Sequence, residues 1–591
     1  MSILHILQKN TVESLQVLYG QDFSEQDFQV NQTKPEFEGD YTVVLFSLVK
    51  RLKLSPDAIG NALGGHLVKT YPELFTGFNI IKGFLNLSVA NSYWISLLEK
   101  NHNDVCFGKQ AMNGKRVMVE YSSPNTNKPL HLGHLRNNFL GWSVAEILKA
   151  NGYEVFKSCI VNDRGIHICK SMIAWQLFAD GATPASTHTK GDHFVGDYYV
   201  KFNDEYKKQV SELMDKGMNK ENAEKEAPIM QATQQMLLDW EAGKPDVMEL
   251  WKRMNSWVYE GFDVTYKNIG SDFDKTYYES NTYLLGKKIV EEGLAKGVFV
   301  KDPDNSVWID LTNDGLDRKI VQRKDGTSVY ITQDIGLAQQ KYEEYKIDQS
   351  IYVIGDEQNY HMKVLKLIAE KLGLPNAENI YHLSYGMVEL PTGKMKSREG
   401  TVVDADDLVD EMIATAKQHT EDLGKVKDFT TEELASLYKT IGLGAMKFYL
   451  LRVDPKKKMI FNPQESIDFH GFTGPFIQYT YARIKSILRK ETLQPGASLG
   501  ADLLPLEKEI LITLEQYPTI VMQAGREQNP SAIANYLFHL AQVFNSFYAE
   551  HSIANAENES KKQLRLQLSS MTANILKSGT ALLGIQVPER M

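Results

Sequence analysis

The chain has 591 residues and a formal net charge of −10, so we expect roughly three or four domains and no general affinity for nucleic acid unless lysines gather on one face. Hydrophobic residues make up 42% of the sequence, but no run of about 18 apolar residues and no N-terminal targeting pattern occur, which argues against a membrane-spanning helix and favours a cytoplasmic protein. The three cysteines, Cys106, Cys159 and Cys169, lack C-x-x-C spacing, so they support neither a disulfide framework nor a zinc site, and no protein metal site is predicted.

Residues 1–108 have the pattern of a small N-terminal α/β domain. Three segments carry apolar residues at helical spacing, and two further segments have the composition of strands. Lys82-Gly83 stands between the two strands and is typical of a hairpin turn. The predicted helices are 3–18, 41–50 and 57–71, and the predicted strands are 78–81 and 84–89.

Residues 115–185 alternate between strand and helix. The segment 117–136 begins as an apolar strand, passes through a proline-broken loop and enters a helix expected over 131–150, with Gly152 just after its end. The next strand is expected over 155–161. This alternation predicts a parallel sheet of Rossmann type, in which ligands bind at the carboxyl ends of the strands.

The start of the helix 131–150 has the features of a phosphate site. A helix start offers unpaired backbone N–H groups and the positive end of the helix dipole. His131 and His134 lie three residues apart and share one face of the first turn, Gly133 lets a ligand approach the backbone, and Lys128 adds a cation. These residues predict a polyanion site, most simply for the triphosphate of ATP.

The remainder of the chain contains an insertion, a returning α/β pattern and a helical end. Residues 186–260 are charged and mostly helical, and we interpret them as an insertion on the catalytic sheet. Strands are expected over 351–354 and 382–389. The predicted domains are the N-terminal domain 1–108, a catalytic domain over 109–405, a helical connector over 406–470 and an all-α bundle over 471–591.

A second motif, Lys394-Met-Lys-Ser-Arg-Glu-Gly400, places three cations within five residues. Together with His131-Leu-Gly-His134 it resembles the paired signature motifs, "HIGH" and "KMSKS", of class I aminoacyl-tRNA synthetases. Three further segments are similar to the arginyl-tRNA synthetase family within that class: residues 122–125 (Ser-Ser-Pro-Asn), Tyr330-Ile-Thr-Gln-Asp334, and the C-terminal residues 587–591. The resemblance extends over almost the whole chain.

The resemblance implies an arginine–tRNA ligase that uses ATP, with magnesium held mainly by the ATP phosphates and water. The enzyme would form arginyl-adenylate with tRNA(Arg) already bound and then load the 3′ end of that tRNA. The protein needs no covalent nucleophile for this chemistry, because it acts by positioning the partners and by stabilising charge on the phosphates. The N-terminal domain would contact tRNA, the C-terminal bundle would bind the anticodon, and we expect a monomer. The alternative for the N-terminal domain is a structural role without RNA contact.

By the same resemblance, the catalytic residues are His131, His134 and Lys394, to which we add Lys128, and the ATP-binding residues are His131, Gly133, His134, Gly386, Met387, Lys394, Lys396 and Ser397. The second motif departs from the class pattern, since Ser397 stands where its second lysine is found. We therefore hypothesise that Lys128 compensates. A second departure is Arg164, which stands where the family often has an aromatic residue.

An arginine side chain presents five donors in a planar fork, which carboxylates in the same plane match best. The resemblance assigns the arginine site to Glu120, Ser122, Asn125, Tyr330, Asp334 and Gln358, with Asn125 and Gln358 at the α-amino end. Structural alternatives remain for three of them: Asp334 as a helix N-cap, Tyr330 as a core aromatic residue, and Gln358 as a polar helix cap.

Aromatic residues among cations suit base stacking and phosphate contact. The candidates for tRNA binding are Tyr479, Tyr481 and Arg483, and Lys485, Phe547 and Tyr548 fit the same pattern. Each of these side chains has burial in the core as its alternative. Three other functions remain open: another class I synthetase such as the cysteinyl type, a small-molecule nucleotidyltransferase, and a synthetase-like protein without catalysis.

Overall fold

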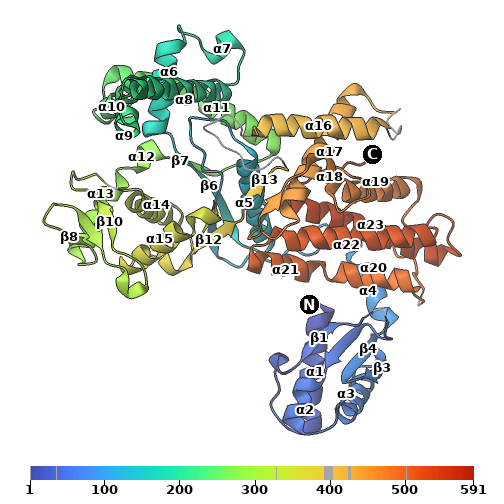
Figure 1. Ribbon diagram of the computed structural model, residues 1–591. Coiled ribbons are helices and arrows are strands. Elements are labelled where there is room, and N and C mark those ends of the chain that lie inside the picture. Colours follow the sequence, from blue (N-terminus) through green and yellow to red (C-terminus); the bar gives the residue numbers. More distant parts are fainter. Residues whose placement is uncertain (1, 35, 328, 392–402, 423–427, 501) are drawn as a thin grey trace.

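The computed structural model describes residues 2–34, 36–327, 329–391, 403–422, 428–500 and 502–591. A parallel sheet lies at the centre of the molecule, with the C-terminal helices on one side and the helical insertion on the other (Figure 1). The N-terminal domain lies apart from this sheet, next to the C-terminal helices (Figure 1). Among the described residues, no helix is both long and apolar enough to cross a membrane.

The N-terminal domain packs helices against a four-stranded antiparallel sheet of order β1-β2-β4-β3. The hairpin at Lys82-Gly83 is confirmed, because both residues have positive φ (50° and 84°) between β3 and β4. The prediction of a helix over 41–50 was wrong for its first half, which pairs with β4 as a strand. The elements are α1 (Ile3–Tyr19), β1 (Gln29–Gln32), β2 (Tyr41–Val44), α2 (Phe46–Leu52), α3 (Pro56–Thr70), β3 (Phe75–Ile81) and β4 (Phe84–Val89).

The central sheet is five-stranded, all parallel, and ordered β12-β11-β5-β6-β7. Its chain order runs outward from β5 through β6 to β7 and then crosses to β11 on the other side of β5. This reversal opens a crevice between β5 and β11 at their carboxyl ends, where open parallel sheets bind ligands. The predicted Rossmann-type sheet is thus confirmed, with β5 (Arg116–Glu120), β6 (Glu154–Val161), β7 (Lys275–Tyr278), β11 (Gln349–Gly355) and β12 (Ile380–Tyr385).

The single strand predicted over 382–389 is divided into two. β12 ends at Tyr385, and β13 (Val388–Glu389) leaves the sheet to pair with β14 (Met459–Ile460). Gly386 permits this change of direction, because a Cβ there would lie 2.6 Å from the backbone of Lys457.

The helix predicted over 131–150 is α5 (Leu132–Ala150), with Gly152 at φ 82° just after its end. Its residues are buried on several faces, because the sheet covers one side and C-terminal helices cover another. Gly141 of α5 packs closely against the residue after β5, since a Cβ there would lie 2.4 Å from Tyr121.

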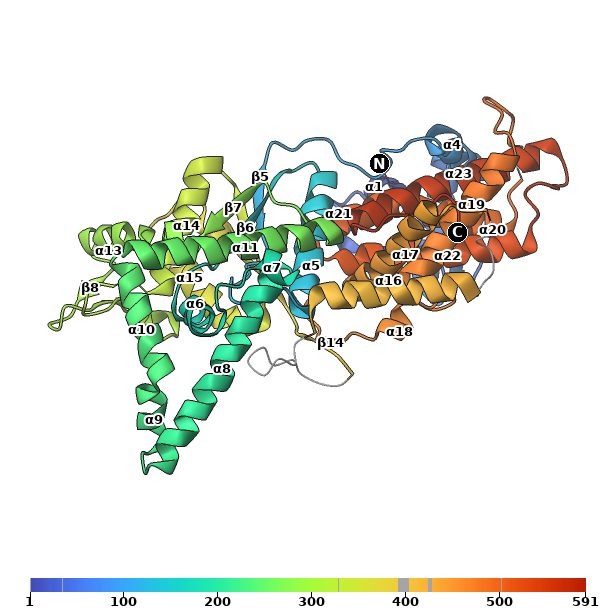
Figure 2. The ribbon, with the colours of Figure 1, turned by 90° about the horizontal axis from the view of Figure 1, so that it is seen from above.

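The predicted insertion is helical, and Figure 2 shows part of it projecting as an arm with α9 at its tip. A second unit was not anticipated. It carries a three-stranded antiparallel sheet of order β10-β9-β8 and a hydrophobic cluster of its own around Phe299 and Val321. The elements from the first to the second unit are α6 (Ile166–Phe178), α7 (Pro184–Thr187), α8 (Gly191–Asp215), α9 (Lys220–Glu226), α10 (Pro228–Glu241), α11 (Pro245–Ile269), α12 (Glu279–Thr282), α13 (Leu285–Ala295), β8 (Val300–Lys301), β9 (Val307–Ile309), β10 (Lys319–Gln322), α14 (Tyr330–Tyr345) and α15 (Asn359–Lys371).

The C-terminal part is helical, as expected. α4 (Asn91–Asn101) joins it from the N-terminal side, where the Asn574 amide donates to the His102 carbonyl at 2.9 Å. The helices are α16 (Ala405–Asp422), α17 (Thr431–Leu451), α18 (Pro463–Ser466), α19 (Gly474–Lys490), α20 (Pro505–Glu515), α21 (Tyr517–Glu527), α22 (Pro530–Glu550) and α23 (Glu559–Leu582).

Candidate active site

The loop after β5 has an unusual backbone. Ser122 and Ser123 are consecutive non-glycine residues with positive φ (77° and 48°), a conformation that concentrates at functional sites. The Ser122 N–H donates to Asn137 Oδ1 at 2.5 Å, and its hydroxyl lies 2.6 Å from the Tyr266 hydroxyl. Ser122 is buried, and its N–H and hydroxyl both have partners within the protein, so it shapes the loop. Its expected contact with arginine stays a prediction.

The loop holds Asn125 at the sheet edge. A backbone bridge pairs Asn125 with Asn162, which follows β6, and the Thr126 N–H donates to the Asn162 carbonyl at 3.1 Å. Asn125 itself is exposed at this edge.

The two signature histidines accept hydrogen bonds from backbone N–H groups at the start of α5. His131 is the N-cap residue, and its Nδ1 accepts from the Gly133 N–H at 3.1 Å. The His134 Nδ1 accepts from the His131 N–H at 3.1 Å. Because both Nδ1 atoms accept, each neutral ring must carry its proton on Nε2.

Both histidines are neutral at physiological pH. Burial and the nearby Lys128 charge lower the pKa of His131 to about 4. Burial, with His131 and Lys128 beside it, lowers the pKa of His134 well below its usual value. The rings lie 4.0 Å apart, so the helix start presents two neutral Nε2–H donors side by side.

A cavity of about 220 Å³ opens beside these residues. Lys128 and His131 line one wall, the start of α8 lines another, and Asp404 contributes from the segment before α16. Lys394, Lys396 and Ser397 lie outside the described residues. Gly386 and Met387 follow β12 at the carboxyl edge of the sheet, where Met387 is exposed and Gly386 is buried.

Glu120, at the end of β5, does not stand alone. Its carboxylate accepts from the Lys341 ammonium of α14, and both side chains are buried. Although burial favours the neutral amine, the Glu120 charge keeps the pKa of Lys341 above its usual value. The Lys341 ammonium also lies 4.7 Å from the centre of the Tyr352 ring. Lys341 thus neutralises Glu120, and no sequence motif indicated it.

Tyr330 and Asp334 lie one turn apart at the start of α14. The helix is capped by Val329, so Asp334 is not the N-cap that remained an alternative, and Tyr330 is 67% exposed, so it is not a core residue. Asp334 Oδ2 lies 2.7 Å from His361 Nε2 of α15. Gln358 is exposed at the end of a 3₁₀ turn, Asp356–Gln358, that follows β11.

Glu279 is a further acid that sequence reasoning missed. It is the residue directly after β7, and that position after a strand was the available signal. Burial raises the pKa of Glu279 to about 7, with the Arg164 charge opposing and the Asp163 and Asp334 charges contributing. Asp163 in turn is held by Ser280, whose N–H donates to it at 2.8 Å.

Arg164 takes the place of the aromatic residue expected at its turn. Its guanidinium lies 4.2 Å from the centre of the Tyr283 ring and 5.1 Å from that of Trp240. A flat guanidinium stacks on aromatic faces, so it fills the position of an aromatic ring while adding a charge near Glu279.

The predicted tRNA-binding residues separate into two groups. Tyr481 is 2% exposed and donates to Glu589 at 2.9 Å, which favours its alternative as a core residue over contact with tRNA. Phe547 is likewise buried. The Arg483 guanidinium instead lies 4.9 Å from the Tyr479 ring and 5.1 Å from the Tyr548 ring, and Tyr548 is 39% exposed.

Comparisons with known proteins agree with this arrangement. Residues 96–462 match the family described as "tRNA synthetases class I (R), catalytic domain", residues 477–591 match "DALR anticodon binding domain", and residues 5–89 match "Arginyl tRNA synthetase N terminal domain". The chain is 54% identical to an arginine–tRNA ligase of Flavobacterium psychrophilum and 52% identical to one of Bacteroides fragilis, with 100% of each chain covered in both cases.

The fold is similar to solved structures as well. The arginyl-tRNA synthetase of Thermus thermophilus superposes with a TM-score of 0.79 at 23% identity, covering 100% of both chains. The Plasmodium falciparum arginyl-tRNA synthetase superposes with a TM-score of 0.75 at 19% identity, covering 100% of this chain and 99% of the other. The chain therefore belongs to the arginyl-tRNA synthetase family of class I aminoacyl-tRNA synthetases.

Proposed function

We propose that the protein is an arginine–tRNA ligase, which activates L-arginine with ATP and transfers it to the 3′ end of tRNA(Arg). The observation that carries this proposal is the pairing of two sites at one sheet edge. A helix start with two neutral Nε2–H donors follows β5. The partly buried acid Glu279 follows β7 of the same sheet, and Asp334 on α14 contributes to its raised pKa.

At the ATP end, His131 and His134 donate hydrogen bonds from Nε2 to the phosphates, and Gly133 leaves room at the backbone. Lys128 supplies a positive charge on the same side. Lys394, Lys396 and Ser397 belong to this end by their motif, and Gly386 and Met387 contact the nucleoside. Magnesium accompanies ATP and is held by its phosphates and water.

At the arginine end, Asp334 and Glu279 meet the guanidinium, with Tyr330 beside them. Glu120 contributes less than its motif suggested, because Lys341 already neutralises it. Asn125 and Gln358, exposed at the ends of neighbouring parts of the sheet, hold the α-amino group. A buried acid without a cationic partner is costly, so neutral amino acids are rejected strongly.

The tRNA reaches from the catalytic crevice to the C-terminal bundle. The cluster of Tyr479, Arg483 and Tyr548 offers aromatic faces and a cation for an unstacked base. The N-terminal domain contributes a further contact. The enzyme acts as a cytoplasmic monomer and needs bound tRNA to form the adenylate.

Arginine-dependent ATP–pyrophosphate exchange tests the function, measured with and without total tRNA and with lysine and cysteine as control amino acids. We expect exchange with arginine only, and only when tRNA is present. Exchange with another amino acid would overturn the arginine pocket but keep the class of enzyme. Absence of exchange with every amino acid would indicate a synthetase-like protein without catalysis.

A further inference from the structure

A network of charged side chains lies at the base of the helical insertion, where α8 begins. The Lys190 Nζ atom lies 2.5 Å from Asp406 Oδ2 and 3.1 Å from Asp192 Oδ2. It also lies 2.5 Å from Thr265 Oγ1 of α11, and Thr265 donates to Asp406 Oδ1 at 3.0 Å. One ammonium therefore connects α8 and α11 to the start of α16.

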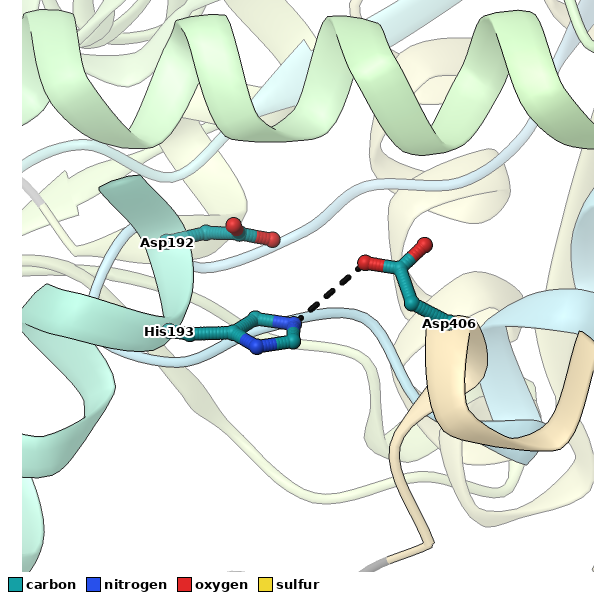
Figure 3. A group of neighbouring side chains, drawn as sticks. All are labelled: Asp192, His193 and Asp406. Atoms are coloured by element: carbon teal, nitrogen blue, oxygen red, sulfur yellow. Dashed lines mark ion pairs between the residues drawn. The ribbon is translucent and has the colours of Figure 1, made fainter. Parts of the chain in front are cut away.

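His193 joins the same network from the first turn of α8. Its Nε2 lies 3.3 Å from Asp406 Oδ2 and 3.2 Å from Asp404 Oδ2. Figure 3 shows the His193 ring and the Asp192 carboxylate pointing across the gap toward Asp406. Two cations and three carboxylates thus gather from two chain segments that lie about two hundred residues apart.

The ligand atoms of Asp192, His193 and Asp406 all lie within 4.8 Å of one another, which resembles a metal site. Two observations argue against that use. The Lys190 ammonium contacts both carboxylates and already supplies the cation. The nearby Asp404 and Asp406 carboxylates raise the pKa of His193 to about 10, which favours a protonated ring, and metal binding at Nε2 would have to displace that proton.

Three glycines hold α8 close to its neighbours. A Cβ on Gly191 would lie 1.9 Å from the Trp257 carbonyl oxygen, and a Cβ on Gly261 would lie 2.3 Å from Asp192 Oδ1. A Cβ on Gly196 would lie 2.8 Å from Pro129, in the loop that carries Lys128. The start of α8 is thus packed against both α11 and the loop that carries Lys128.

The other side of the network is bonded to the first signature motif. Asp404 caps α16, because its Oδ1 accepts from the Asp406 N–H at 2.7 Å. The Ala405 N–H donates to the Leu130 carbonyl at 2.9 Å, and the Leu132 N–H donates to the Val403 carbonyl at 3.3 Å. These two bonds lie on either side of His131, which pairs with Asp404 across an isolated bridge.

We propose that Lys190, assisted by His193, is a positioning residue for arginine activation: it fixes residues 403–406 to the insertion and thereby sets His131 and Lys128 at the ATP site. Lys190 and Asp406 do not line the cavity beside His131, whereas His193 and Asp404 do, so Lys190 acts on the ATP site through these neighbours. The kinetic part of this proposal rests on the proposed function.

The test compares Lys190→Met, Lys190→Arg and a control, Lys208→Met, in tRNA-dependent pyrophosphate exchange. Lys208 is exposed on the same helix. We expect Lys190→Met to lower kcat about 10- to 100-fold, as small misplacements of reacting groups do, with the KM for arginine unchanged. Lys190→Arg should recover most of the loss, since a guanidinium keeps the charge and reaches two carboxylates. Lys208→Met should behave as wild type.

Hydrogen–deuterium exchange without substrates gives a readout that does not depend on which reaction is catalysed. We expect faster amide exchange over residues 130–135 and 403–408 in Lys190→Met and in His193→Gln, so the proposal stays testable even if the wild type shows no arginine-dependent activity. Unchanged amide exchange in both variants would overturn it, and so would faster amide exchange with unchanged kcat. A rise in the thermal midpoint of the wild type with ZnCl₂ would show a metal site instead.

Discussion

At the scale of single residues, Glu120 at the end of β5 and Glu279 just after β7 differ in their electrostatic surroundings. Glu120 is paired with the buried Lys341. Within the described part of the chain, Glu279 has no salt-bridge partner within 4 Å, and burial raises its pKa to about 7. A guanidinium arriving at this sheet edge therefore gains more from Glu279, which among the described residues has only the more distant Arg164 charge nearby, than from Glu120, which is paired with Lys341.

The pH dependence of the KM for arginine in Glu279→Gln tests whether Glu279 meets the guanidinium. In the wild type, Glu279 is mostly neutral below pH 7, so the KM for arginine should fall as the pH rises from 6 to 8. In Glu279→Gln the KM should stay high and flat across that range, about 30-fold above wild type at pH 8, which corresponds to ~2 kcal/mol for a lost buried charge pair. Pyrophosphate exchange at a series of pH values measures both. A wild-type KM for arginine in Glu279→Gln would show that Glu279 does not bind the guanidinium.

The same substitution has an opposite effect on stability. The pKa of Glu279 is raised from 4.5 to about 7 in the folded protein, so the folded state holds this proton more tightly than the unfolded state. Its charge thus destabilises the fold increasingly between those two values and fully above pH 7. Glu279→Gln should have the higher thermal midpoint at pH 8 and no advantage at pH 4.5. Calorimetry at the two pH values checks the sign.

Lys128→Ala tests whether this lysine compensates for the absent second lysine of the signature loop. Lys128 shares a cavity wall with His131, and its charge helps to lower the pKa of His131 to about 4. Loss of one preorganised cation at the phosphates should reduce kcat for exchange about 100-fold with little change in the KM for arginine. Lys115→Ala, at an exposed lysine before β5, is the matched control. Little change in Lys128→Ala would refute the compensation.

Local pattern explains which of these residues could be found from the sequence. His131 and His134 were recognisable because the start of a helix and its capping depend on residues that are adjacent in the sequence. Lys341 and Glu120 are 221 residues apart, so their pairing depends on how α14 packs beside β5, which no local signal encodes. The burial of Tyr481 was not predictable for the same reason, since its alternation with Arg483 on one helix does not reveal which face is buried.

At the scale of elements, the sheet was predictable because strand and helix alternate through residues 115–185, whereas β2 and the β8–β10 unit were not. β2 has four residues, and β8 and β9 have only two and three. Such short strands carry too few residues for a period of two to stand out against a helical one. Their existence depends on cross-strand partners, such as Tyr41 opposite Leu87.

The packing of α5 against the loop after β5 is a critical contact between two elements. A Cβ on Gly141 would lie 2.4 Å from Tyr121, so Gly141→Ala should push α5 away from the loop that carries Asn125. We expect a loss of about 1–3 kcal/mol in unfolding free energy, typical of overpacking, together with a lower kcat. Gly65→Ala in α3 is the control: its Cβ meets nothing within 4 Å, and alanine should stabilise that helix by up to about 1 kcal/mol. Equal midpoints for the two variants would contradict the argument.

At the scale of the whole molecule, the C-terminal residues tie separate helices together. Glu589 accepts from the Tyr481 hydroxyl at 2.9 Å and lies 3.3 Å from the Lys485 ammonium, both on α19. The next residue, Arg590, places its guanidinium 4.3 Å from the Phe429 ring, just before α17. The tail thus holds α19 in place from the side opposite to Tyr479 and Arg483, which lie one turn apart on the same helix.

Glu589→Gln should therefore weaken tRNA binding without altering the catalytic crevice. The variant keeps the shape of the side chain but loses its charge, and the ion pair to Lys485 is partly exposed, so the net cost is ~1 kcal/mol. We expect the loss of this contact to misplace α19. A cost of that size in tRNA binding raises the KM for tRNA about 5-fold, while the KM for arginine at saturating tRNA stays at the wild-type value. Glu550→Gln, at an exposed position in the same bundle, controls for the loss of one negative charge near the tRNA. A KM for tRNA that falls in both variants would mean that charge repulsion, not the position of α19, governs binding at this end of the molecule.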